Sequence, residues 1–167
     1  MNEVPSLAHA CLDWWQELAS RPGDRAALRR AATVNDALMV PSAHHLAHRV
    51  RSAGMRSPRR VALLAALLAQ ARSCETEGDP LAMRLGKKDG NRAAFSESRF
   101  RRLLRASDDD DLLLQLRRAI RMLDDRIHLP SLTDAIRFWS FDSGRQVRTM
   151  TEWACDYYAS APAPNAD

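Results

Sequence analysis

The chain has 167 residues, of which 46% are hydrophobic and 28% are charged, a composition typical of one globular domain rather than a disordered chain. The longest apolar run, residues 61–69, is too short to span a bilayer, which needs roughly 20 residues. The first residues lack the basic start and apolar core of a secretion signal. Three scattered cysteines, Cys11, Cys74 and Cys155, form no CxxC pair, which argues against a disulfide framework or a zinc ribbon. We therefore expect a soluble, cytoplasmic protein, in which Cys11 and Cys155 act as small apolar residues on helix faces.

Charge is distributed unevenly along the chain, although the net charge is only +4. Of the 25 basic residues, all except Lys87 and Lys88 are arginines. The segment 21–72 holds ten arginines against two acids, and the segment 84–105 holds eight basic residues against two acids. Acidic residues gather instead at 75–79, 108–111 and 124–125. Basic blocks of this kind favour a partner that carries phosphate groups.

Apolar residues recur with helical spacing along the chain, and no segment shows the alternation of a half-buried strand. Proline, glycine, serine and aspartate separate the apolar segments. Asp24 is expected to cap the second helix, and Pro58 fits the first turn of the fourth. The predicted helices span residues 6–19, 25–32, 42–52, 58–71, 96–106, 108–127, 131–141 and 145–158.

The predicted fold is all-α, a compact bundle of about eight helices in two lobes. Residues 1–74 form the N-terminal lobe, and its buried centre is expected to be the helix of residues 58–71, which is apolar nearly all round. Residues 75–94 form a basic connector loop. Residues 95–160 form the C-terminal lobe, and residues 161–167 form a disordered tail.

Residues 108–127 combine an acidic start with an apolar stripe. Aspartates 108–111 complement the dipole at a helix N-terminus, so we interpret them as capping residues rather than as a metal site. The stripe has a spacing of three or four residues, and we expect it to face the core. It consists of Leu113, Leu116, Ile120, Leu123 and Ile127.

Arginines are concentrated on the two helices within residues 96–123 and on the segment 25–30. Spacings of three and four residues place several of them on shared helix faces, where like charges are mildly destabilising. One interpretation is that these arginines only keep the helices hydrated and that nearby aspartates neutralise them. We favour phosphate contact for some of them, because they outnumber the acids around them.

The motifs that carry catalysis or metal binding are absent from the sequence. Residues 85–91, LGKKDGN, lack the glycine spacing of a phosphate-binding loop, although a flexible basic loop could still grip a nucleic-acid backbone. His44, His45 and His48 lack further zinc ligands and the HExxH pattern. Most aromatic residues fall on apolar helix faces and are not interleaved with basic residues, so nucleic acid would be held by its backbone. We therefore expect no enzymatic activity, no cofactor, no metal and no small-molecule substrate.

Six pieces follow one another along the chain: DWWQEL, GDRAALRRA, RLGKKD, FSESRFRRLL, QLRRAIRML and DAIRFWSFDSGRQVRTMTEWACDYY. They cover most of residues 10–158, and in their order, spacing and total length the chain resembles the CasB family, the small subunit of the type I-E CRISPR surveillance complex Cascade. The resemblance implies a non-enzymatic, all-α protein present as two head-to-tail copies beside the backbone and large subunits. It also implies contact with CRISPR RNA and with target DNA, including the displaced strand of the R-loop, and no membrane contact.

The resemblance further implies that basic residues within the matching pieces contact nucleic acid. They are Arg25, Arg29, Arg30, Lys87, Lys88, Arg99, Arg102, Arg105, Arg117, Arg118, Arg121 and Arg145. The aspartates at 108–111 predict that Arg105 is neutralised internally. Three alternatives remain open at this point: a stand-alone helical DNA-binding regulator, a purely structural assembly scaffold, and a helical enzyme that uses the histidines and a metal.

Overall fold

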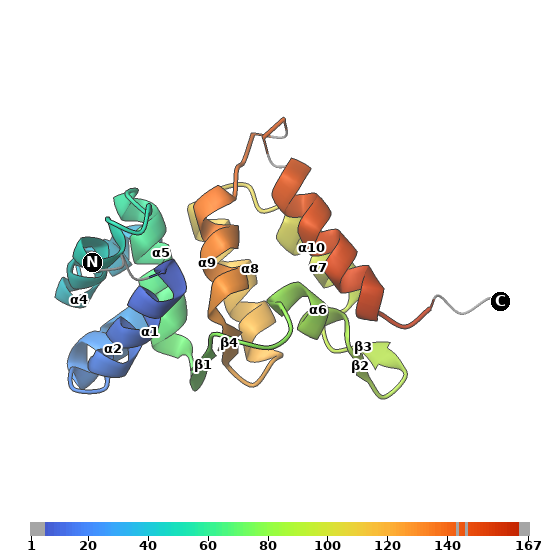
Figure 1. The fold of residues 1–167 in the computed structure, drawn as a ribbon, viewed down its shortest axis with the longest axis horizontal. Coiled ribbons are helices and arrows are strands. Elements are labelled where there is room, and N and C mark those ends of the chain that lie inside the picture. The colour runs from blue at the N-terminus through green and yellow to red at the C-terminus, as the bar shows by residue number, and fades with distance from the viewer. Residues whose placement is uncertain (1–5, 143, 146, 164–167) are drawn as a thin grey trace.

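The computed structural model describes residues 6–142, 144–145 and 147–163, and helices dominate this part of the chain (Figure 1). The prediction of a mostly helical fold is confirmed. In chain order the elements are α1 (Leu7–Leu18), α2 (Pro22–Arg30), α3 (Val34–Leu38), α4 (Pro41–Val50), α5 (Pro58–Gln70), β1 (Ser73–Glu75), α6 (Leu81–Gly86), β2 (Lys88–Asp89), β3 (Arg92–Ala93), α7 (Glu97–Leu104), α8 (Asp109–Arg121), β4 (Arg126–His128), α9 (Leu129–Phe138) and α10 (Val147–Ser160).

The central element is α5, as its apolar sequence predicts. Ser57 caps its N-terminus by accepting a hydrogen bond from the backbone of Arg60, and Pro58 occupies the first turn. Every residue from Val61 to Gln70 is buried. Besides α2, α3 and α4, the helix packs against α8 and α9, so its surroundings extend beyond the N-terminal segment that it was expected to centre. Figure 1 shows α5 between the N-terminal helices and the pair α8 and α9.

The start of α2 differs from the prediction. The helix begins at Pro22, so Asp24 lies within its first turn and is not the N-cap. The Asp24 carboxylate instead accepts hydrogen bonds from the backbone N and the hydroxyl of Ser42, at 3.1 and 2.5 Å. Asp24 therefore ties α2 to the first turn of α4, a tertiary role that local sequence does not indicate.

The long helix predicted for residues 108–127 ends early, at Arg121. Asp124 and Asp125 both adopt left-handed backbone conformations, with φ values of 56° and 57°, and these turn the chain out of the helix. Ile127 then lies in β4, which pairs in parallel with β1 and places Ile127 opposite Cys74. Ile127 is fully buried as predicted, although in a strand.

The segment 75–94, predicted as a connector loop, contains α6 and the antiparallel pair β2 and β3. Helix α6 packs closely on α10: a Cβ atom added at Gly86 would lie 2.2 Å from the carbonyl oxygen of Tyr157. The Tyr157 hydroxyl donates to the carbonyl of Phe95 at 2.6 Å, and the Ser160 hydroxyl donates to that of Met83 at 2.6 Å. Residues 75–94 are thus partly built into the packing of the C-terminal helices.

Two other expectations have mixed outcomes. Cys11 is fully buried on α1, and burial raises the pKa of its thiol to about 12, as suits a small apolar residue. Cys155 is exposed on α10, so the expectation for that residue was wrong. The predicted disordered tail, residues 161–167, lies outside the described residues from 164 onward.

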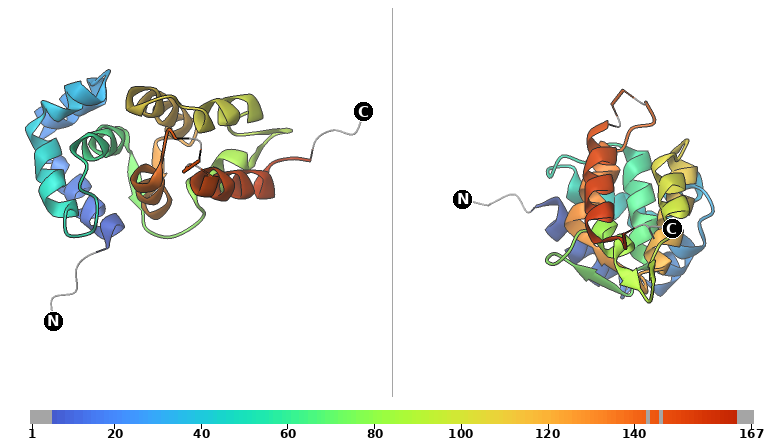
Figure 2. Two further views of the ribbon diagram at one scale, coloured as in Figure 1. Left: turned by 90° about the horizontal axis from the view of Figure 1, so that it is seen from above. Right: turned by 90° about the vertical axis from the view of Figure 1, so that its right-hand side faces the viewer.

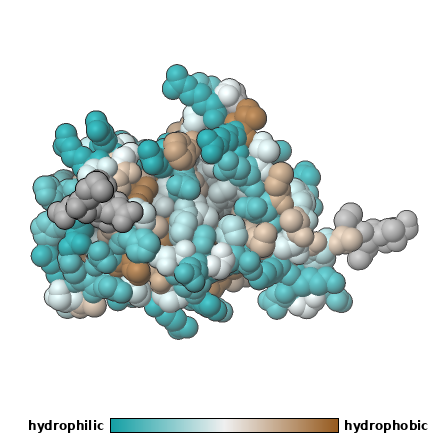
Figure 3. All heavy atoms as spheres, viewed as in Figure 1, coloured by the Kyte–Doolittle hydropathy of each residue, from teal (hydrophilic) through white to brown (hydrophobic). Residues whose placement is uncertain are grey.

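The surface is largely polar, and polar side chains cover most of the face shown in Figure 3. Among the described helices none is long and apolar enough to cross a membrane. Figure 2 shows α7 and α8 along one side of the molecule and α9 and α10 along the other. Helices α7 and α8 hold five of the ten arginines selected from the sequence.

Candidate nucleic-acid interface

Helices α7 and α8 each bury an apolar stripe and leave arginines outside. In α7, Ser96 caps the N-terminus, and Phe100 and Leu103 are buried, so Arg99 and Arg102 face outward. In α8, Asp108 caps the N-terminus by accepting a hydrogen bond from the backbone of Asp111, as its sequence position predicts. The buried stripe of α8 leaves the side chains of two further arginines exposed. These are Arg118 and Arg121.

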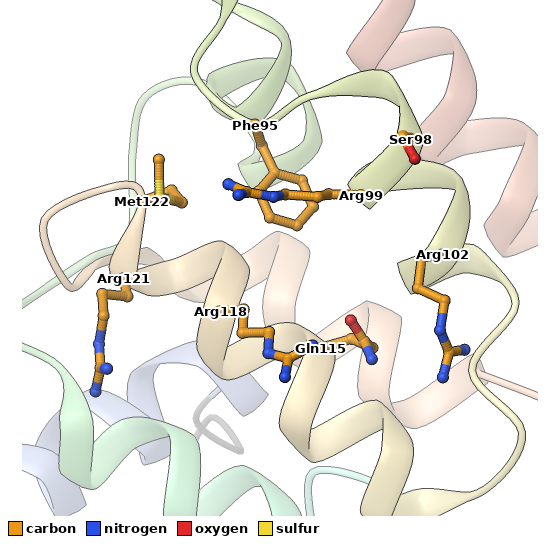
Figure 4. A pocket seen from close by; sticks show the side chains of 8 residues that line it. All are labelled: Phe95, Ser98, Arg99, Arg102, Gln115, Arg118, Arg121 and Met122. Atoms are coloured by element: carbon orange, nitrogen blue, oxygen red, sulfur yellow. The ribbon is translucent and has the colours of Figure 1, made fainter.

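A groove of about 570 Å³ lies between these two helices (Figure 4). Arg99 and Arg102 reach it from α7, and Arg118 and Arg121 reach it from α8. No carboxylate is among the described residues that line it. The remaining lining residues are Phe95, Ser98, Gln115 and Met122.

A second hollow, of about 350 Å³, continues this surface toward α2. Arg29 and Arg30 of α2 line it together with Arg117 and Arg121, and Arg121 also lines the first groove. The carboxylate of Asp125 lines this hollow as well, and it accepts a hydrogen bond from Gln70 at 2.6 Å. Arginines that are far apart in the chain therefore meet on one continuous surface. We call this surface the arginine face and define it as Arg29, Arg30, Arg99, Arg102, Arg118 and Arg121.

Most charges of the arginine face are available to a partner. Arg102 forms the one internal pair of the face, with two contacts to Asp111 at 3.1 and 3.2 Å, and it keeps 55% of its side chain exposed. Within the described part of the chain, the other five side chains form no hydrogen bond or ion pair. Guanidinium groups in this state neutralise phosphates without first giving up an internal contact.

Two predicted contact residues donate instead to backbone carbonyls at helix ends, although Arg117 also lines the second hollow. Arg25 donates to the carbonyls of Ala69 and Ala71, at 3.2 and 2.8 Å, where α5 ends. Arg117 donates to the carbonyls of Ala31 and of Leu28, the latter at 2.9 Å, where α2 ends. Loss of hydration lowers the pKa of Arg117, and the neighbouring Arg121 lowers it further. These guanidinium groups satisfy helix C-termini, so their contact with nucleic acid stays a prediction that the geometry does not favour.

The aspartates at 108–111 have separate tertiary partners. Asp109 forms ion pairs with Arg59 and Arg60, at 3.2 and 3.0 Å. Asp110 accepts a hydrogen bond from the backbone of Val34 at 2.8 Å. With Asp108 capping α8 and Asp111 holding Arg102, none of the four pairs with Arg105 in the described structure. The expected neutralisation of Arg105 is therefore wrong.

Four predicted residues lie away from both hollows. Arg105 is exposed at the end of α7, and Lys88 is exposed on β2. Lys87 pairs with Asp79, and Arg145 lies 4.0 Å from Asp142 with 85% of its side chain exposed. Nucleic-acid contact by these residues stays a prediction.

Some lining residues were not selected from the sequence. Gln115 is buried and donates to Asp111 at 3.1 Å, and Phe95 is buried beside the groove. Met122 lines the groove from the end of α8. One local signal exists for Met122, because it follows Arg118 by four residues and so shares its helix face. Phe95 lies outside both helices, so no periodicity indicates its place.

Comparison with known proteins identifies the family and the fold of the chain. The family model of the CRISPR-associated protein Cse2 matches residues 24–158. The crystal structure of CasB from Thermus thermophilus matches with a TM-score of 0.62 and 27% sequence identity, over 93% of this chain and 99% of that chain. No curated protein matches the chain. Because the family match spans most of the chain and the fold agrees along nearly its whole length, the chain belongs to the Cse2 family, the CasB-type small subunits of the CRISPR complex Cascade.

Proposed function

We propose that this Cascade small subunit holds nucleic-acid backbone on its arginine face and stabilises the R-loop during CRISPR defence. The expected partners are CRISPR RNA and target DNA, including the displaced strand. A second copy of the chain and the backbone and large subunits of Cascade complete the proposed assembly. The role is non-catalytic and cytoplasmic: base pairing reads the sequence, and the protein holds the backbone.

One observation carries the proposal. Arginines from α2, α7 and α8 line two adjoining hollows, and only Arg102 among them has an internal carboxylate partner in the described structure. If these arginines only kept their helices hydrated, arginines from three separate helices would not need to meet. Each phosphate neutralised contributes a slope of about −0.7 for single strands, or about −0.9 for duplex, to log K against log salt concentration.

The assembly-scaffold alternative also has one supporting observation. Phe138, Phe141 and Val147 are exposed near the start of α10, with exposures of 49%, 39% and 60%. Exposed apolar residues gathered in this way are typical of protein contacts. None of these three residues lines either hollow of the arginine face, so one molecule can use both surfaces.

The proposal is tested by the lifetime of the R-loop on a matched target, measured with complete Cascade across a salt series. Complexes contain the wild-type subunit, Arg118→Glu, Arg29→Glu, or no small subunit. We expect both variants to shorten the lifetime and to change its salt dependence. Arg56→Glu is the matched control, because Arg56 is exposed, lines neither hollow and is not among the predicted contact residues. An unchanged lifetime with Arg29→Glu and Arg118→Glu, in complexes that assemble fully, would contradict the proposal.

A further inference from the structure

A separate hollow of about 610 Å³ lies on the other flank of α7 from the groove. Arg99 and Arg102 of α7 line the groove, whereas Glu97 and Arg101 line this hollow. Tyr158 of α10 and Arg92 of β3 also line it. We call it the Tyr158 hollow. Because the two sites share α7, a bound polymer strand that lies across this short helix can reach both.

Tyr158 is fixed in place although it is exposed. Its ring stands perpendicular to those of Phe100 and Tyr157, with centroids 6.4 and 5.2 Å away. Its hydroxyl donates to Glu97 Oε1 at 2.9 Å. Nevertheless, 48% of Tyr158 is exposed. A tyrosine held by two rings and a hydrogen bond loses little conformational freedom when a flat partner stacks on it.

The charges around Tyr158 suit an anionic chain. The carboxylate of Glu97 is paired with Arg101 at 2.6 Å, and hydrogen bonding to Tyr158 and Glu97 raises the pKa of Arg101. Arg92 is exposed, and its side chain has no hydrogen bond or ion pair among the described residues. Among the described residues that line the hollow, Glu97 alone carries a carboxylate and it balances Arg101, whereas Arg92 retains its full charge beside the ring.

We propose that the Tyr158 hollow takes a nucleobase from the single strand whose backbone lies on the arginine face. The base stacks on the Tyr158 ring, and Arg92 meets a flanking phosphate. The inference rests on the proposed function and extends it from backbone contact to base contact. Stacking of this kind is independent of sequence, because every base has a π-face. It also revises the interpretation that aromatic and basic residues are separate, since folding brings Arg92 and Arg101 beside Tyr158.

The test uses the full chain and single-stranded oligonucleotides labelled at one end, with binding followed by fluorescence anisotropy. Each sequence is prepared with normal bases and as a matched strand with a short abasic segment stepped along it. Tyr158→Leu removes the ring and keeps an apolar side chain, whereas Tyr158→Phe keeps the ring and removes the hydroxyl. We expect Tyr158→Leu to weaken binding of the normal strand about five- to a hundredfold, and Tyr158→Phe to bind nearly as wild type.

Abasic strands and fluorescence quenching separate stacking from a fold defect. When the abasic segment lies at the position that faces Tyr158, wild type and Tyr158→Leu should bind the strand with equal affinity. A 2-aminopurine at the same position should be quenched by wild type and by Tyr158→Phe but not by Tyr158→Leu. If wild type and Tyr158→Leu bind the normal strands with equal affinity, the inference is overturned. It is also overturned if Tyr158→Leu loses the same factor of affinity for normal and for abasic strands.

The proposed function fails in a different way from the inference. If Arg118→Glu leaves the affinity for both strand types unchanged, the backbone role of the arginine face is wrong. If Arg118→Glu weakens both and Tyr158→Leu weakens neither, only the inference is overturned. If Tyr158→Leu impairs assembly with nuclease-treated Cascade proteins but leaves strand binding intact, the hollow is a protein contact, and the inference is overturned as well.

Discussion

Arg117 and Arg118 are neighbours on α8, yet they lie in opposite environments. Arg117 is half-buried and donates to two carbonyls at the end of α2, whereas Arg118 is exposed in the groove without an internal partner in the described structure. The same contrast separates Arg25 from Arg29 on α2. Arginine therefore has two uses in this molecule: one set joins helices, and the other carries charge to the surface. The contrast shows that the number of arginines on a helix does not measure its binding capacity.

The largest expected effect concerns the buried side of α8. Leu116 is 1% exposed, two residues before Arg118 and on the opposite face. Leu116→Asp would bury an unpaired carboxylate and should cost more than about 4 kcal/mol of unfolding free energy. Loss of the cooperative transition in urea, followed by circular dichroism, is the measurement. Leu114→Asp is the control, because Leu114 is 46% exposed and should tolerate the charge.

The next effect sharpens the comparison of neighbouring arginines. Arg117→Met removes the donors to the carbonyls at the end of α2 and should lower the unfolding free energy by about 2–3 kcal/mol. Arg118→Met should change it by no more than about 0.5 kcal/mol. The measurement is the unfolding free energy of both variants in urea. Equal stabilities would mean that the helix-joining role of Arg117 is wrong.

Binding should show the reverse order. Arg118→Met should weaken single-strand binding and reduce the slope of log K against log salt by about 0.7, the loss of one phosphate contact. Sequence preference should not change, because no base edge is read. For Arg117→Met, the slope measured where the protein remains folded should equal that of wild type. If Arg117→Met also reduces the slope of log K against log salt concentration, Arg117 contacts phosphate too, and the proposed separation of helix-joining from surface arginines is wrong.

The smallest effect concerns a buried group that is held neutral. His128 caps α9 through Nδ1, which accepts a hydrogen bond from the backbone N of Ser131 at 3.3 Å and lies 2.9 Å from the Ser131 hydroxyl. Burial lowers the pKa of His128 below 6.5, and Arg84 lowers it further, against the opposing charges of Glu75 and Asp79. The unfolded chain therefore takes up this proton first, so stability present above about pH 6.5 is lost as the pH falls.

The pH effect is measured as the difference in unfolding free energy between pH 7.5 and pH 5.5. The carboxylates with lowered pKa, including Glu75 and Asp79, stay ionised throughout this window. His128→Asn keeps a capping acceptor but removes the titration, so its pH dependence should be flatter than that of wild type. An identical pH dependence in the two proteins would count against the role of His128.

Local pattern predicts much of the helical structure but misses elements with little local signal. The structure confirms the buried helix that the apolar run of α5 predicts. It also confirms the helix starts that are predicted from Ser57 with Pro58 and from Asp108. Each of these signals lies within the helix concerned or next to its first turn, so the local sequence reveals it. The short helices α3 and α6 and the three-residue strands β1 and β4 were missed. Elements of this length are too short to show periodicity, and β1 and β4 are stabilised by pairing with each other across some fifty intervening residues.

The sequence by itself determined the helical class, the buried faces of α5, α7 and α8, and the presence of excess arginine on the exposed faces, because these depend on residue spacing within a single helix. Only the tertiary structure decided which arginines remain available. Arg117 meets carbonyls of α2 that are more than eighty positions away in the chain, and Arg121 joins two hollows into one face. It also placed Tyr158 beside Glu97 and Arg101. Contacts of this kind depend on how helices pack against one another, and no period within one helix encodes that packing.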